Sequence, residues 1–226
     1  MPDRARAREL AAEYIRKGDP LGWFEVLYRE GERGRAAVPW ADLEPNSSLI
    51  EFWKAHPLES AGKRALVIGC GFGDDTEQLA AWGFKTTGFD ISKTAIEGTK
   101  KRYPKTQIEY VVADLFSPPP NWLLSFDFVL EIYTIQSLPF ELHPKAAEAI
   151  ARFVAPGGRL LVLARGRGEG ETGGPGPPWP LTRAEMDGFV RAGLQEELFE
   201  DYAEPEPPWV RRFRALYRRP RPAASS

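Results

Sequence analysis

The sequence has very few of the residues that form disulfides or bind transition metals. Its 226 residues include one cysteine and two histidines. A single cysteine cannot form an internal disulfide, so nothing in the chain requires an oxidising compartment. His56 and His143 lie far apart, each is followed by proline, and their spacing matches no metal site. We therefore predict no bound metal.

Long apolar runs and an excess of one charge are also absent from the sequence. No apolar run is long enough to cross a bilayer, and residues 1–6 lack the apolar stretch of a secretory signal. The net charge of -2 gives no general attraction to nucleic acid or to an anionic membrane. These absences predict a cytoplasmic protein with neither a nucleic-acid nor a membrane partner.

The length suits one α/β domain, and strand and helix signals alternate from residue 64 onwards. This alternation predicts a Rossmann-like, doubly wound, mostly parallel sheet with helices on both faces. The last two strands are predicted to form a hairpin at the sheet edge. The expected strands are 64–69, 85–89, 108–112, 126–132, 159–164, 194–202 and 211–218, and the expected helices are 3–17, 74–82, 92–102, 144–154 and 182–192.

The connections carry their own predictions. Pro156, Gly157 and Gly158 are expected to make a sharp turn into the fifth strand. Residues 166–180 are dense in glycine and proline and are expected to be a flexible loop. Residues 1–219 are predicted to form one domain, followed by a disordered tail at 220–226.

A glycine-rich turn follows the first predicted strand. Its glycines, Gly69, Gly71 and Gly73, alternate with Cys70 and Phe72. Ligands of open α/β sheets bind at the carboxyl ends of the strands, and glycines let the backbone approach a ligand closely. A dinucleotide motif would place glycine where Asp74 stands. An acidic side chain there opposes a pyrophosphate and suits an ammonium or sulfonium group, which favours S-adenosylmethionine over NAD.

Two further carboxylates follow the next two strands. Asp90 is placed to accept hydrogen bonds from both ribose hydroxyls, although a helix cap would also explain it. Asp114 is placed to accept a hydrogen bond from an adenine amino group, although it could instead simply begin a polar loop. Ile91 and Leu115, next to these carboxylates, could enclose the adenine ring between them.

Five pieces of the chain, in order, resemble the core of class I S-adenosylmethionine-dependent methyltransferases. The matching pieces are 69–73, Asp90, 113–115, 126–129 and 154–160. The resemblance implies a seven-stranded sheet whose last strand is antiparallel, with S-adenosylmethionine as cofactor and S-adenosylhomocysteine as product. It also implies that Gly69, Cys70, Gly71, Gly73, Asp74, Asp90, Ile91, Asp114 and Leu115 bind the cofactor.

A second resemblance concerns the N-terminal part. Trp23, the Val38-Pro39-Trp40 stretch and the Asp74-Asp75 end of the glycine turn are similar to small-molecule methyltransferases of the thiopurine, thiol and halide type. In that group an aromatic N-terminal segment covers the cofactor. The similarity implies that residues 1–60 form a cap over a 61–219 core, that Trp40 contacts the cofactor, and that Trp23 or Phe24 lies nearby. The alternative is that these aromatic residues are ordinary core.

Glu131 and Tyr133 are the candidate catalytic residues, because both lie at the end of the fourth strand, which faces the cofactor in this fold. Apolar neighbours indicate that Glu131 is buried and has a partner. Glu131 could hold the methionine part of the cofactor, bind a substrate amine, act as a base, or form a structural pair. Cys70 is not expected to be a nucleophile, because it lies between glycines with no histidine near it in sequence.

The expected reaction is in-line transfer of the sulfonium methyl group to a small molecule. The cofactor is already activated, so alignment should be the main contribution of the protein. An anionic sulfur or halide needs no general base, whereas an oxygen nucleophile does, and neither histidine is placed to serve as one. This favours a thiol or thiopurine-like acceptor over oxygen or nitrogen. The assembly is expected to be a monomer or a homodimer.

Other functional classes remain open from the sequence alone. They are an NAD-linked oxidoreductase, a non-catalytic nucleoside-binding protein, and an RNA or protein methyltransferase, although the last lacks an Asn/Asp-Pro-Pro-Tyr type motif after the fourth strand. A C-terminal arginine cluster is interpreted as a solvated face, with an anionic substrate or RNA as alternatives. Its members are Arg211, Arg212, Arg214, Arg218, Arg219 and Arg221.

Overall fold

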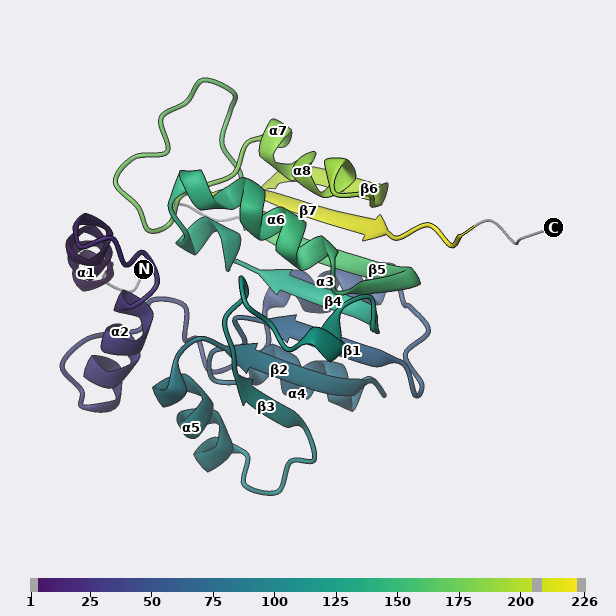
Figure 1. Cartoon of the computed structure of the whole chain (residues 1–226), viewed down its shortest axis with the longest axis horizontal. Helices are drawn as coiled ribbons and strands as arrows, with labels where there is room; N and C mark the ends of the chain where they lie inside the picture. The colour runs from purple at the N-terminus through teal and green to yellow at the C-terminus, as the bar shows by residue number, and fades with distance from the viewer. Residues whose placement is uncertain (1–3, 205–208, 223–226) are drawn as a thin grey trace.

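The computed structural model describes residues 4–204 and 209–222, which fold around one seven-stranded sheet (Figure 1). The strand order is β3-β2-β1-β4-β5-β7-β6, and β7 runs antiparallel to both of its neighbours. The predicted fold class is therefore confirmed, including the edge hairpin of β6 and β7. The strands are β1 Arg64–Ile68, β2 Lys85–Asp90, β3 Glu109–Val112, β4 Phe126–Ile132, β5 Val154–Arg165, β6 Gln195–Ala203 and β7 Arg211–Arg218.

Helices cover both faces of the sheet because alternate strand side chains are apolar on each face. On one face, Leu49 and Phe52 of α3 (Ser47–Ala55) and Leu79 of α4 (Asp74–Ala81) pack on β1, β4 and β5. On the other face the sheet packs against α6 (His143–Ala151), α7 (Arg183–Met186) and α8 (Gly188–Arg191). Helix α5 (Lys93–Arg102) packs on β2 and β3. Short 3₁₀ turns span Pro120–Trp122, Ile135–Ser137 and Phe140–Leu142.

Side-chain caps determine where two of the predicted helices begin. The Ser92 hydroxyl accepts a hydrogen bond from the Ala95 N–H at 3.1 Å, which satisfies one of the free donors at the start of α5. Thr182 and Glu185 form the reciprocal capping box at the start of α7. The helix expected at 182–192 is divided at Asp187, however, so α7 and α8 are two separate single turns.

The sharp turn expected at Pro156, Gly157 and Gly158 is wrong, because these residues lie inside β5. The pairing of β4 with β5 shifts register between Phe126 and Phe128, as it does at a β-bulge. Gly157 has a φ of +84°, and its N–H donates to the Arg219 carbonyl at 2.8 Å. The glycines therefore bend a continuous strand rather than end it.

The first two helices form a unit at one end of the sheet. Helices α1 (Ala5–Arg16) and α2 (Trp23–Glu32) pack together through a cluster that includes Leu10, Trp23 and Leu27. Figure 1 shows that the parallel strands point toward these helices. We call residues 4–46 the cap. A ligand at the carboxyl ends of the strands therefore lies beneath the cap.

A partly buried carboxylate links the cap to the core. Glu25 of α2 accepts hydrogen bonds at 2.7 Å from the Ser92 and Thr94 hydroxyls and one at 3.1 Å from the Thr94 N–H, at the start of α5. Burial opposes its ionisation, but these hydrogen bonds outweigh burial and lower the pKa of Glu25 to about 2. The carboxylate therefore stays charged at the positive end of the α5 dipole.

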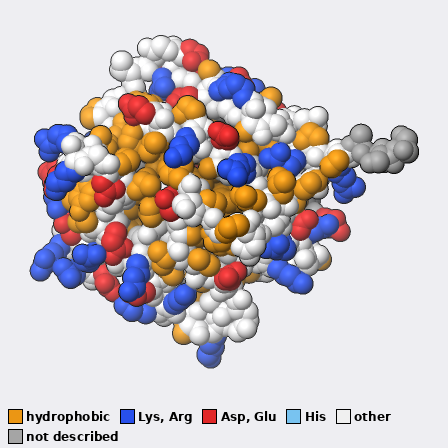
Figure 2. All heavy atoms as spheres, in the orientation of Figure 1, with side chains coloured by type: hydrophobic (Ala, Val, Ile, Leu, Met, Phe, Trp, Pro, Cys, Tyr) orange, Lys and Arg blue, Asp and Glu red, His pale blue; other side chains and the backbone are white. Residues whose placement is uncertain are grey.

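Charges of both signs are distributed over the surface. Figure 2 shows Lys and Arg side chains interspersed with Asp and Glu side chains over the described part of one face. Within residues 4–204 and 209–222, no helix has the length and apolar character needed to span a membrane. Of the tail expected to be disordered, 220–222 have no regular structure, and 223–226 lie outside the described residues.

Candidate cofactor and acceptor site

A cavity of about 330 Å³ lies between the carboxyl ends of the strands and the cap. Its walls combine backbone turns from the core with aromatic side chains from the cap. The residues that line it include Arg4, Phe24, Tyr28, Trp40, Asn46, Gly69, Cys70, Gly71, Asp74, Asp75, Asp90, Ile91, Asp114, Leu115, Tyr133, Gln136, Arg165, Glu204 and Arg212. Most of the residues predicted from the sequence are thus brought together here.

The glycine turn forms the floor of the cavity. Gly69 and Gly71 have φ values of +57° and +53°, a conformation that L side chains rarely adopt. A Cβ on Gly69 would lie 2.6 Å from the Thr134 hydroxyl oxygen. Gly73 does not line the described cavity. It caps α4 with a φ of +87°, so its contribution is to set the path of the turn.

Asp90 lies at the end of β2, beside the glycine turn. Its two oxygens accept hydrogen bonds from the Gly71 N–H at 3.0 Å and the Ser92 N–H at 2.8 Å. Burial raises the pKa of Asp90 to about 6, because these two bonds only partly replace water. Each carboxylate oxygen keeps acceptor capacity, so the group suits a pair of hydroxyl donors.

The end of β3 supplies the next part of the wall. The Asp114 carboxylate accepts a hydrogen bond from the Phe116 N–H at 2.8 Å, which holds the loop, and it also borders the cavity. Ile91 and Leu115 line the same region. A carboxylate flanked by two branched apolar side chains suits a flat heteroaromatic ring that bears an amino group.

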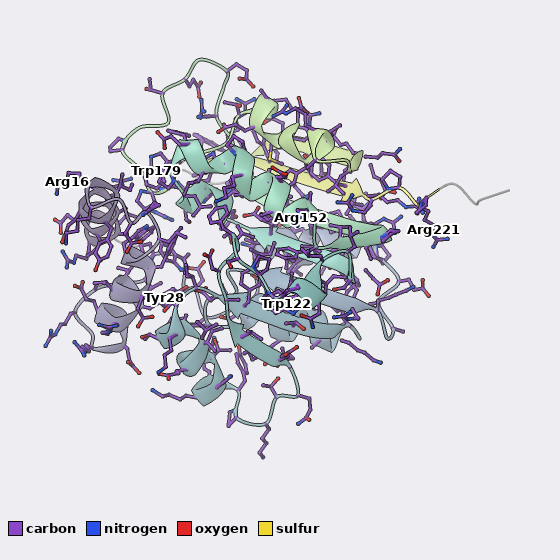
Figure 3. All side chains as sticks on the ribbon, in the orientation of Figure 1. Arg16, Tyr28, Trp122, Arg152, Trp179 and Arg221 are labelled. Atoms are coloured by element: carbon purple, nitrogen blue, oxygen red, sulfur yellow. The ribbon has the colours of Figure 1, made fainter. Side chains whose placement is uncertain are left out.

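Aromatic side chains of the cap close the cavity. The Trp40 indole N–H donates to the Tyr28 hydroxyl at 2.8 Å, and the Tyr28 ring meets Phe72 of the glycine turn edge-on at 5.3 Å. Figure 3 labels Tyr28 on α2 and Trp179 in the loop after β5, and Trp179 packs against the cap. Phe24 borders the cavity, whereas Trp23 is fully buried in the cap core.

Glu131 occupies a different position from the one expected. Its side chain is fully buried, as expected, but does not border the described cavity, whereas Ile132 and Tyr133 do. Its Oε1 accepts hydrogen bonds from the Thr134 and Ile135 N–H groups at 2.7 and 2.9 Å, and its Oε2 has no partner among the described residues. The carboxylate therefore holds the turn that follows β4.

Tyr133, within that turn, does border the cavity. Its φ of +61° is a strained conformation for a non-glycine residue, and the Glu131 hydrogen bonds to the next two N–H groups hold it. The Arg212 guanidinium lies 4.8 Å from the centre of its ring. Burial raises the pKa of Tyr133 despite this positive neighbour, so the phenol is a neutral hydrogen-bond donor at physiological pH.

Comparison with known proteins identifies the family. A family model described as a methyltransferase domain matches residues 66–162. A probable thiol methyltransferase of Arabidopsis thaliana is 30% identical over 80% of this chain and 76% of its own length. The chain belongs to the class I S-adenosylmethionine-dependent methyltransferases.

Two further comparisons are consistent with this family. A thiocyanate methyltransferase of Brassica oleracea is 29% identical over 69% of this methyltransferase, and the match spans 66% of the Brassica protein. The solved structure of an S-adenosylmethionine-dependent methyltransferase from Methanosarcina mazei superposes on this chain with a TM-score of 0.64 and 16% sequence identity. The match covers 79% of this chain and 100% of that chain. The second likeness establishes the fold.

The two acidic residues after the glycine turn have different roles in this methyltransferase. Arg102 donates to both oxygens of Asp74 at 2.7 and 2.8 Å, and the Tyr103 hydroxyl donates to Oδ1 at 3.0 Å. Asp74 thus borders the cavity, as expected, but already has a cationic partner within the protein. Asp75 borders the cavity with no cationic partner among the described residues, and burial raises its pKa to about 6.

Cys70 also borders the cavity, and the structure agrees with the expectation that it is no nucleophile. Burial and the nearby Asp90 carboxylate raise the pKa of its thiol well above the ordinary value. The thiolate, which is the nucleophilic form, is therefore disfavoured.

Sequence reasoning did not assign several residues that line the cavity, namely Arg4, Asp75, Gln136, Arg165 and Glu204. Arg165 follows the fifth predicted strand. The expectation that ligands bind at the carboxyl ends of the strands, which identified Asp90, could therefore have identified Arg165 too. Arg212 was assigned to a solvated cluster. Arg211 and Arg214 do pair with Asp201 and Glu200, but Arg212 reaches the cavity.

Glu131→Gln should change the pH dependence of folding stability. The pKa of Glu131 is raised by burial from 4.5 to about 7. Its protonated form therefore contributes stability that is complete below about pH 4.5 and is lost as the pH rises through about 7. Glutamine does not titrate, so the unfolding free energy of the variant minus that of the wild type should increase by about 2 kcal/mol between pH 5 and pH 8.

Urea unfolding at both pH values measures this difference. Glu148→Gln removes an exposed carboxylate of α6 and controls for the loss of one negative charge. A Glu131→Gln difference that stays constant between pH 5 and pH 8 would show that Glu131 does not titrate in this range.

Proposed function

We propose that this methyltransferase transfers a methyl group to the sulfur of a small thiol acceptor. The observation that carries the proposal is the lining of the cavity around Tyr133. Its described residues include no histidine or lysine, the Glu204 carboxylate there is paired with Arg212, and the phenol of Tyr133 is a donor rather than a base. A thiol is a few per cent ionised at neutral pH and is highly nucleophilic in that form, so it needs no general base. The thiol and thiocyanate methyltransferases among the relatives support the same acceptor atom.

The core residues would hold the adenosine part of the cofactor. Asp90 would accept hydrogen bonds from the two ribose hydroxyls, and Asp114 would accept one from the adenine amino group. Ile91 and Leu115 would enclose the ring. The order of these residues along the strand ends matches the order of ribose and adenine in the ligand.

The remaining cavity residues would hold the methionine part and align the acceptor. Asp75, rather than Asp74, would pair with the cofactor ammonium group. Trp40 and Phe24 would cover the cofactor and exclude water. When bound, S-adenosylmethionine supplies an electrophilic methyl group on a positively charged sulfur. Tyr133 would donate a hydrogen bond at the transfer end, and the protein would act mainly by positioning.

Methyl transfer to benzenethiol, phenol and aniline tests the acceptor atom. We expect kcat/KM for the thiol to exceed that for phenol by about 100-fold or more, because no base assists the oxygen acceptor. For two thiols with different pKa values, kcat/KM should reach its plateau at a lower pH for the more acidic thiol. Equal rates with phenol, or a levelling pH that is the same for both thiols, would contradict the proposal.

A further inference from the structure

Three arginines from separate parts of the chain line the acceptor end of the cavity. Arg4 immediately precedes α1, Arg165 ends β5, and Arg212 belongs to β7. Burial, together with the positive charges of Arg4 and Arg212, lowers the pKa of Arg165 to about 10, and Arg212 likewise contributes to a lower pKa of Arg4. The three side chains line one cavity and are close enough for their positive charges to repel one another. Folding has therefore concentrated positive charge at one end of a cavity.

These arginines have few hydrogen-bond partners among the described residues of the protein itself. The Arg165 guanidinium has no hydrogen bond or ion pair with any described residue. Within the described chain, the buried Nε of Arg4 and the buried Nη1 of Arg212 also have no partner. Arg212 does pair with Glu204 through its other nitrogens. A buried guanidinium donor without a partner is costly, so the arrangement favours an anion supplied from outside the chain.

Positive charges outnumber negative ones around these arginines. The Glu204 carboxylate is bonded to Arg212, and the Asp42 carboxylate interacts with Arg4 at longer range, but Arg8 adds a further positive charge near Arg4. A net positive charge therefore remains at this end of the cavity. A guanidinium presents parallel N–H donors that match the two oxygens of a carboxylate.

We propose that Arg4, Arg165 and Arg212 form a binding site for a carboxylate group on the acceptor, so that the substrate is a small thiol acid. This inference rests on the proposed function for the thiol, but the anion site is carried by the arginines alone. The carboxylate would lie at the arginines while the sulfur lies beside Tyr133, within reach of the cofactor methyl group. The acid therefore fixes the orientation of the thiol, and the arginines select acids over neutral thiols.

The test uses a matched pair of acceptors, 3-mercaptopropionate and its methyl ester, which carry the same thiol but differ at the carboxyl group, charged in the acid and neutral in the ester. We expect kcat/KM for the acid to exceed that for the ester by about 50-fold in the wild type. In Arg165→Gln the acid-to-ester ratio should fall below about 5, mainly through a higher KM for the acid. Arg4→Gln, which changes a residue outside the sheet, should lower the ratio in the same direction. Arg159→Gln is the control, because Arg159 lies near the middle of β5, does not line the described cavity and pairs with Glu197.

A binding measurement separates the anion site from the reaction. Calorimetry with S-adenosylhomocysteine present should show that 3-(methylthio)propionate binds the wild type at least about 10-fold more tightly than it binds Arg165→Gln. The methyl ester of this compound should bind the two proteins with equal affinity. Arginine-dependent binding of the acid without methylation of either thiol would uphold the anion site and reject the proposed function. Methylation of acid and ester with equal efficiency would uphold the proposed function and overturn the anion site.

Discussion

Asp90→Asn is expected to weaken S-adenosylhomocysteine binding by about 30- to 100-fold. Asp90 already accepts hydrogen bonds from Gly71 and Ser92, and its remaining acceptor capacity faces the cavity. Asparagine removes the negative charge and turns one acceptor oxygen into a donor, so two ribose hydroxyls can no longer both donate. Hydrogen bonds to a charged group are the stronger kind, which is why the expected loss is about 2 to 3 kcal/mol.

Calorimetric titration of the purified variant with S-adenosylhomocysteine measures the change. Asp127→Asn is the matched control, because Asp127 also accepts a backbone hydrogen bond, from Arg64 at 2.9 Å, but at the opposite end of the sheet. Its affinity should stay within about threefold of the wild type. Circular dichroism establishes that both variants are folded. Unchanged affinity in a folded Asp90→Asn protein would remove Asp90 from the ribose site.

Gly73→Ala is expected to destabilise the protein by about 3 kcal/mol. An alanine at a φ of +87° destabilises the folded state by about 1 kcal/mol, because an L side chain is disfavoured in the left-handed backbone conformation. Its Cβ would also lie 2.6 Å from the Thr99 methyl carbon and 2.7 Å from the Tyr110 hydroxyl oxygen. Both neighbours are buried, so they cannot move aside without disturbing the core, which adds the cost of overpacking.

Gly18→Ala separates the two contributions. Gly18 has a similar φ of +78° but no atom within 4 Å of the position of a Cβ, so this variant should lose only about 1 kcal/mol. Urea unfolding of both variants measures the difference. Equal losses would mean that the packing around Gly73 adds nothing and that backbone conformation alone requires glycine there.

Local signals in the sequence predicted most of the fold. The capping residues Ser92 and Thr182 mark helix starts in the structure because the side chain and the backbone group it binds lie within three residues of each other. Short apolar runs in succession with helix signals predicted all seven strands for a similar reason, since a buried strand leaves a local pattern in the sequence. The turn expected at Gly157 failed because a bulge and a turn both use glycine at positive φ, and only pairing with β4 and β7 distinguishes them.

The carboxyl-end rule likewise placed Asp90, Asp114 and the glycine turn at one cavity from the sequence alone. Sequence reasoning assigned Asp74 and not Asp75 to the cofactor, because the pairing of Asp74 depends on Arg102, which approaches it from another helix. It also misjudged Glu131, whose carboxylate holds the turn after β4 and does not border the described cavity.

The sequence by itself determined the sheet, the family and the strand-end side of the cavity, because each rests on signals local to a strand and the turn that follows it. Only the tertiary structure decided the side of the cavity that the arginines line. Arg4, Arg165 and Arg212 are separated by many residues and meet there because the cap folds over the strand ends and β7 inserts beside β5. Charges brought together over such separations leave no local pattern, so the concentration of positive charge emerges only when the chain is folded.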